Sequence, residues 1–382
     1  MNKVIDAYRY FFPVGWGLGV WGVFLWILFP IGWVQYPGQT HPDLMLGGFF
    51  LSFVCGFLMT AAPKFTSSFE PTLTEQRTAF ALIALLISAV VFYSKIYFYS
   101  IVVLIFLFLM IFLIRRFLNR RSSPPDAFLF VGVGVFVGLA GSFGLLLGYT
   151  IGLSSFFFQL SRLLFLQAYI FCLVLGVGTR LIPALLGWTE GPQISAPQKK
   201  RVKLFAILAL VFITSYILEA ADLGVWAQVL RTLVIGYIAF SFWKIHKLPA
   251  RRGIQTWWLW ISCWSLLLGQ AAMVLFIDYR IHLLHVILVS GLALMTFMIA
   301  TRVSLAHGKH DLNLERNSKV LFVGALLVSL AGFTRLSAGF APHIYQSHLI
   351  YASYTWILGL VVWAFVFIPK MIHIRDKPFK GN

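Results

Sequence analysis

The residues best suited to chemistry in this sequence are histidines at the ends of long apolar segments. His41 opens one segment, in the stretch THPDLMLGGF, His282 and His285 open another, and the last segment is preceded by His343 and His348. Neutral imidazole is a common ligand of iron and copper. Residues three apart share a helix face, so His282 and His285 could point together towards a helix that carries His41. The pattern predicts a metal or haem site, with hydrogen bonding by scattered interfacial histidines as the alternative.

Three arginines form a second group inside the apolar segments, namely Arg162, Arg231 and Arg335. A charge at membrane depth is costly, so each side chain should face the bundle interior and have a partner. One interpretation pairs the three with carboxylates expected on the same side, which are Glu219, Asp222 and Asp278. The other interpretation is a clamp for an anion, for instance the propionates of a haem, because carboxylates match the geometry of guanidinium groups.

The elements that would position these residues are transmembrane helices. Of the 382 residues, 60% are hydrophobic and 11% are charged, and the mean hydropathy is +0.88, whereas soluble domains have about 25% charged residues. Segments of roughly 18–22 residues almost without charge are typical of bilayer-spanning helices. The sequence therefore predicts an all-α, polytopic integral membrane protein with about 12 transmembrane helices, forming one domain over residues 1–382 without a soluble domain.

The expected spans are 11–33, 44–62, 79–94, 96–114, 127–148, 156–182, 203–219, 224–243, 255–277, 282–301, 319–339 and 348–370. The first segment is too long for the apolar region of a signal peptide and has no small-x-small cleavage site, so we expect it to be retained. The chain has 3 cysteines, Cys55, Cys172 and Cys263. They form no CxxC or CxxCH motif, which excludes a zinc ribbon and a covalently attached c-type haem.

The basic residues predict how the spans are oriented. Nearly all Lys and Arg residues outside the spans lie in the two tails and in alternate connections, including the runs RRFLNRR at 115–121 and KKRVK at 199–203. The other connections hold only Lys95 and Arg280. By the positive-inside rule, both termini should be cytoplasmic. The net charge of +18 is then explained by topology and anionic lipid, and nucleic-acid binding is not needed to account for it.

The same topology puts the five histidines at the external face and Arg180, Arg302 and His307 at the cytoplasmic face. Arg180, in GTRLIPALLG, and Arg302, in ATRVSLAHGKH, close two spans. Arginine at such a position usually reaches the lipid headgroups and complements the helix dipole.

Three stretches resemble the successive signatures of the NnrS family, bacterial inner-membrane proteins with twelve spans that bind haem and copper and are linked to nitric oxide and nitrosative stress. The stretches are THPDLMLGGFFLSFVCGFLMTAAPKFT, GTRLIPALLGW and HVILVSGLALMTFMIATRVSLAHG. The resemblance covers the whole chain. The matching positions are His41, Met45, Gly48, Phe49, Gly56, Phe57, Thr60, Ala61, Pro63, Thr66, Arg180, Ile182, Pro183, His285, Gly291, Met295, Thr301, Arg302, Leu305 and His307.

The resemblance implies that His41 and His285 are ligands of a haem near the external face, with Met45 and Met295 as further candidate contacts. The family commonly has His-x-His-Glu where this chain has His41-Pro42-Asp43-Leu44. A copper ion that needs the second imidazole would require His282, His343 or His348 instead, or copper is absent. Asp43 either complements the positive helix end or orients His41 by accepting its other ring proton.

The function implied by the resemblance is that of an inner-membrane haem protein in nitric oxide or nitrosative stress tolerance. A haem with an open axial position could bind or turn over nitric oxide, whereas a six-coordinate haem would suit electron transfer or sensing. No catalytic residue and no electron donor follow from the motifs. The rival interpretation is a haem-free transporter or channel for a small anion, supported by the membrane-depth arginines and by the glycine-rich run VGVGVFVGLAGSFG at 131–144, although such glycines also serve helix packing alone.

Overall fold

The computed structural model describes residues 6–92, 94–189 and 198–372, which form helices and connections without a β-strand. Within them, 12 helical segments are long and apolar enough to cross a membrane. The protein is therefore an all-α, polytopic membrane protein, and the predicted number of spans is confirmed. Several spans are longer than predicted, because the helices continue past their most apolar part. The tenth begins at residue 277 and the twelfth at residue 342.

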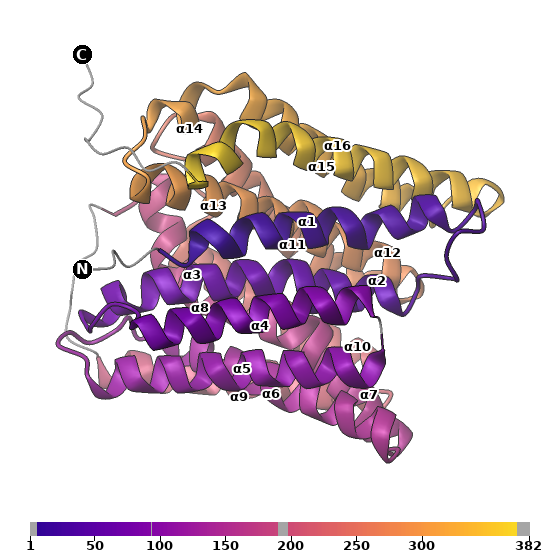
Figure 1. The fold of residues 1–382 in the computed structure, drawn as a ribbon, viewed down its shortest axis with the longest axis horizontal. Coiled ribbons are helices and arrows are strands. Elements are labelled where there is room, and N and C mark those ends of the chain that lie inside the picture. Colours follow the sequence, from indigo (N-terminus) through magenta and orange to yellow (C-terminus); the bar gives the residue numbers. More distant parts are fainter. Residues whose placement is uncertain (1–5, 93, 190–197, 373–382) are drawn as a thin grey trace.

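The spans run side by side along the long axis of the molecule (Figure 1). Four elements are π-helical (η1, η2, η3 and η5), and η4 and η6 are short 3₁₀ helices. In chain order the elements are α1 (Tyr8–Leu28), α2 (Thr40–Asp43), η1 (Leu44–Phe50), α3 (Leu51–Thr66), α4 (Leu73–Val91), α5 (Lys95–Leu118), α6 (Phe128–Thr150), α7 (Ser155–Leu163), η2 (Leu164–Ala168), α8 (Tyr169–Leu186), α9 (Lys199–Ala220), α10 (Gly224–Ile238), η3 (Ala239–Trp243), α11 (Ile254–Leu275), η4 (Ile277–Tyr279), α12 (Arg280–His285), η5 (Val286–Ala293), α13 (Leu294–His307), α14 (Asn313–Asn317), α15 (Lys319–Ser337), η6 (Pro342–Ile344) and α16 (Tyr345–Ile372).

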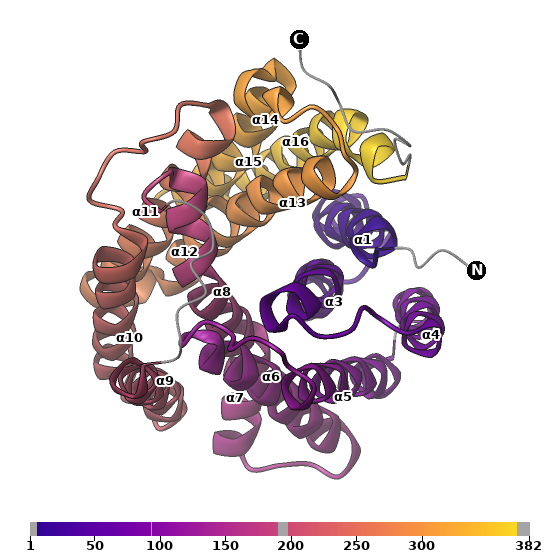
Figure 2. The same ribbon diagram turned by 90° about the vertical axis from the view of Figure 1, so that its left-hand side faces the viewer.

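Three spans form the centre of the bundle, and we call them the central spans: Thr40–Thr66, Ser155–Leu186 and Ile277–His307. Their most apolar windows are 89%, 67% and 67% buried inside the protein, against 50% or less for every other span. Viewed down the helices, α3, α8 and α13 lie towards the middle, with the remaining helices around them (Figure 2). The central spans contain the three sequence stretches that resemble a family signature, apart from the last residues of two of them.

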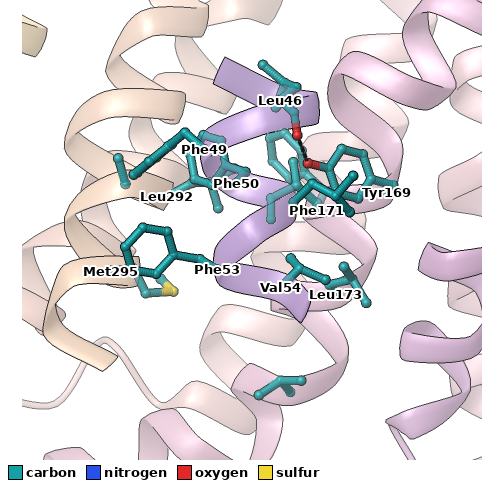
Figure 3. Close-up of a cluster of buried hydrophobic side chains, with 14 of the residues drawn as sticks. Leu46, Phe49, Phe50, Phe53, Val54, Tyr169, Phe171, Leu173, Leu292 and Met295 are labelled. Carbon is teal, nitrogen blue, oxygen red and sulfur yellow. Dashed lines mark hydrogen bonds between the residues drawn. The ribbon is translucent and has the colours of Figure 1, made fainter. Parts of the chain in front are cut away.

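Aromatic side chains fill the space between the first and third central spans. The ring of Phe53 lies 5.2 Å from that of Phe49 and 6.0 Å from that of Phe297. Figure 3 shows Phe49, Phe50 and Phe53 directed from α3 and η1 towards neighbouring helices. On the other side, the Tyr169 hydroxyl donates a hydrogen bond to the carbonyl of Leu46, which ties the first central span to the second.

The backbone of α6 approaches that of the second central span closely, and this contact fixes the position of the span. A Cβ atom at Gly141 of α6 would lie 2.6 Å from the backbone nitrogen of Phe165 and 2.9 Å from the carbonyl oxygen of Ser161. Only glycine leaves room for this contact, and such small residues let membrane helices pack tightly. The same span ends at Gly187, whose φ of 87° terminates α8 in the left-handed conformation, four residues after Pro183.

The spans are arranged as three successive units of four helices. In each unit the first helix packs against the central span of its own unit, as α1 does on α3, α6 on α8 and α11 on α13. The same first helix also packs against the last span of another unit, in the contacts α1–α16, α6–α5 and α11–α10. The repeated contacts close the bundle into a ring around the central spans.

The family-motif residues Arg180, Arg302 and His307 lie at the end of the bundle away from α2 and α12. Arg302 forms an ion pair of 2.5 Å with Glu315 of α14. Burial raises the pKa of the Glu315 carboxyl, and the charge of Arg302 opposes this shift. Arg180 lies over the Phe65 ring at 5.1 Å, and Lys64 Nζ lies 3.0 Å from Nδ1 of His307.

Candidate functional site

A cavity of about 420 Å³ lies between the three central spans. It occupies the end of the molecule where α2, α7 and α12 are found, on the right of Figure 1. Apolar and aromatic side chains make up much of its wall, including Trp26, Phe50 and Trp356, and a few polar groups converge on it. Ligand-binding pockets of roughly 300–1,000 Å³ have this composition.

His41 and His285 both line this cavity, as the sequence predicts for residues of one site. Their ring centroids lie 6.4 Å apart, and the ring planes are parallel to within 5°. Two metal–nitrogen bonds of about 2.0–2.1 Å, together with the distance from each nitrogen to its ring centre, add up to roughly 6.3 Å. The distance between the two ring centres therefore leaves room for one metal ion between the imidazoles.

The hydrogen bonds of the two rings settle which nitrogen is available. Nδ1 of His41 lies 2.9 Å from the carbonyl oxygen of Gly22, and Nδ1 of His285 lies 2.7 Å from that of Ile281. A carbonyl can only accept, so each Nδ1 carries the proton and donates it. Each neutral ring then has its lone pair on Nε2, the arrangement that metal-binding histidines usually have.

Each central span becomes π-helical within a few residues of its cavity-lining polar residue. In the first span η1 begins at Leu44, three residues after His41, and in the third η5 begins directly after His285. In the second, η2 begins two residues after Arg162. A π-helical turn shifts the direction of the side chains before it, and such turns are frequent at functional sites. Nothing in the residue pattern predicts these turns.

Arg162 and Arg335 also line the cavity. Within the part of the chain that the structure describes, neither forms an ion pair with a carboxylate. The guanidinium of Arg335 instead donates to Nδ1 of His282, at 2.7 Å, and to the hydroxyl of Tyr345, at 3.1 Å. The wall also contains Arg280 and one carboxylate, Glu219, so basic side chains outnumber acidic ones among the described residues and the cavity suits an anion.

Arg231 does not line the cavity and is paired as the alternative interpretation expected. Its buried guanidinium forms an ion pair with Glu219, donates to the hydroxyl of Ser215 at 2.9 Å and lies 3.6 Å from the ring centre of Tyr216. Arg280 approaches the same carboxylate at 3.5 Å. The other two acids proposed as partners, Asp222 and Asp278, form no ion pair with an arginine among the described residues.

The other three histidines proposed as ligands lie outside the cavity wall. Nδ1 of His282 lies 2.7 Å from the Arg335 guanidinium and 3.3 Å from the Arg335 carbonyl oxygen, so this ring is held by Arg335. His343 is exposed in η6, and Nδ1 of His348 lies 3.0 Å from the Ser337 hydroxyl. The two methionines proposed as further contacts lie in different places. Met45 lines the cavity, and Met295 lies deeper in the bundle.

Asp43 has a role that the sequence did not reveal. Its buried carboxylate forms an ion pair of 2.5 Å with Lys95 and accepts a hydrogen bond of 2.6 Å from the Tyr99 hydroxyl. No side-chain capping bond begins α2, and Nδ1 of His41 bonds to Gly22 rather than to Asp43. Asp43 therefore anchors the beginning of the first central span to α5. The pairing could have been suspected from Lys95, one of two basic residues in the connections on this side.

Two comparisons with known proteins bear on the whole chain. A family model described as NnrS protein matches residues 5–375. No curated protein matches the sequence.

Proposed function

Because the chain belongs to the NnrS family of membrane proteins, we propose that it is a haem protein of the bacterial inner membrane that acts in the response to nitric oxide. The observation that carries the proposal is the pair of parallel imidazoles, His41 and His285, with their ring centres 6.4 Å apart and both Nδ1 atoms bonded to backbone carbonyls. In this proposal the Nε2 atoms of His41 and His285 would hold one haem iron.

The cavity suits haem better than a bare metal ion. Among the described residues, no three His, Cys, Asp or Glu side chains come together in a way that could hold a metal. Two imidazoles are an incomplete ligand set for an isolated copper or zinc ion. A haem brings most of the ligands of its iron with it, so two histidines from different helices would be sufficient to hold it. A separate copper ion is not part of the proposal.

Other residues around the cavity would bind the haem or orient its two histidines. Arg162 and Arg335 would bind the haem propionates, because guanidinium groups form strong charge-assisted hydrogen bonds with carboxylates. The carbonyls of Gly22 and Ile281 hold the imidazoles in one orientation and make Nε2 more basic. Trp26, Phe50 and Trp356 give the cavity apolar walls for the macrocycle. When bound, the haem supplies one-electron redox chemistry and an affinity for nitric oxide. With both histidines bound, electron transfer or sensing is the expected mode.

An optical spectrum of the purified protein tests the proposal. We expect a Soret band and a pyridine-haemochrome signal, and we expect the variants His41→Ala and His285→Ala to lose haem or to change its axial coordination. His343→Ala is the matched control, because this histidine is exposed and lies outside the cavity. A folded protein without colour or iron would contradict the proposal. It would favour a haem-free anion transporter that uses Arg162 and Arg335.

A further inference from the structure

A second, smaller cavity of about 80 Å³ lies deeper between the same central spans. Its wall combines Phe53 and Val54 of α3, Leu173 and Val174 of α8 and Ile299 of α13 with further apolar side chains. Figure 3 shows Phe53, Val54, Leu173 and Met295 around this region. No part of the proposed haem site uses this cavity.

The wall offers nothing to hydrogen-bond. Its polar side chain is Thr296, whose hydroxyl already donates to the carbonyl of Leu292 at 2.8 Å. Buried water needs two to four polar partners, whereas apolar cavities stay dry and bind molecules such as xenon. The chemistry of the wall therefore excludes water and ions and selects an uncharged, apolar occupant.

The size and the position of this cavity further restrict which molecules could occupy it. A volume of about 80 Å³ is about half the roughly 150 Å³ of an apolar cavity that holds benzene, so a ring of that size, such as the head of a quinone, does not fit. Phe50, which is 2% exposed, lines both this cavity and the larger one that contains His41 and His285. Phe50 is therefore a side chain that the wall of this cavity shares with the wall of the proposed haem cavity.

We propose that this cavity binds a small uncharged gas molecule of the size of nitric oxide or dioxygen and supplies it past Phe50 to the cavity of His41 and His285. The binding step stands on the geometry of the apolar wall alone. The supply step rests on the proposed function, because it needs haem in the larger cavity.

Xenon tests the binding step without any signal from haem. Crystals of the full chain pressurised with xenon should show anomalous density between Val54 and Val174. The variant Val174→Phe fills the space and should abolish that density, and Ile299→Phe fills it from the opposite wall if the first variant does not fold. Val323→Phe, at a position of α15 that is 42% exposed, makes the same change away from the cavity and should leave the density intact. Wild-type protein without xenon at this place would overturn the inference.

Gas kinetics test the supply step. Nitric oxide would have to take the place of one of the two histidines on the iron. In the reduced, haem-loaded protein, Val174→Phe should slow nitric oxide rebinding after flash photolysis several-fold, while the Soret spectrum and the Val323→Phe rate stay at wild-type values. Xenon binding with an unchanged rate would overturn the supply step and leave the binding step standing. A protein that binds xenon but never haem would refute the proposed function and, with it, the supply step.

Discussion

The side chains of the large cavity divide into two chemical roles. His41 and His285 present lone pairs, because their Nδ1 protons are taken by carbonyls. Arg162 and Arg335 present positive charge with no carboxylate partner among the described residues. Metal ligation and anion binding are therefore carried by different residues, and substitutions can separate them.

If the arginines bind the propionates, Arg162→Gln and Arg335→Gln should weaken haem retention without changing its type. Each lost charge-assisted hydrogen bond costs about 1.5–3 kcal/mol, so haem transfer to apomyoglobin should become faster on the order of 10- to 100-fold. The Soret position should not move, because both axial imidazoles remain. Arg120→Gln, an exposed arginine at the other end of α5 from Lys95, is the control. If both Arg162→Gln and Arg335→Gln transferred haem at the wild-type rate, the two arginines would not bind the propionates.

The sequence predicts part of this site and not the rest. The expected topology places five histidines at one face of the membrane, and the family resemblance singles out His41 and His285 among them as ligands. Their orientation could not be predicted, because Gly22 and Ile281 contribute only backbone carbonyls, which no side-chain pattern reveals. Likewise, the sequence contains acids that could pair with Arg231, but only packing selects Glu219.

At the scale of elements, hydropathy predicts the twelve spans but not the π-helical turns inside them. A π-helical turn adds one residue to a helix. This changes the composition and the length of the span too little to be recognised in the sequence. Yet η1 decides where His41 points, because a deletion inside it would rotate everything before it relative to the rest of the span. The turn at Leu44–Phe50 is thus part of the site although two of its residues, Gly47 and Gly48, have no side chain.

Deletion of Gly47 tests this role. Removing one residue should return η1 to α-helical geometry and rotate His41 by about 100° relative to α3. We expect the purified protein to remain monodisperse but to lose the bis-histidine spectrum. Deletion of Phe240 is the matched control, because it lies in η3, a π-helical element that does not line the cavity. An unchanged spectrum after the Gly47 deletion would show that η1 does not set the direction of His41.

At the scale of the whole molecule, the three four-helix units explain why the site residues meet. A unit with an even number of spans returns the chain to the side where it began, so all three units have the same orientation. The central spans, second in each unit, therefore run in the same direction. Each carries its polar cavity residue near its beginning, as His41, Arg162 and His285 do. The three residues consequently reach a similar depth at one end of the bundle.

The distribution of basic residues predicts that this end faces outwards and that both termini are cytoplasmic. Cysteine labelling can test the prediction with little background, because the native Cys55, Cys172 and Cys263 are all buried. Ala221→Cys lies exposed in the connection after α9, on the His41 side, and Arg121→Cys lies exposed after α5, at the opposite end. In intact spheroplasts a membrane-impermeant maleimide should label the first variant and should label the second only after lysis. The reverse pattern would invert the topology and place the proposed haem site at the cytoplasmic face.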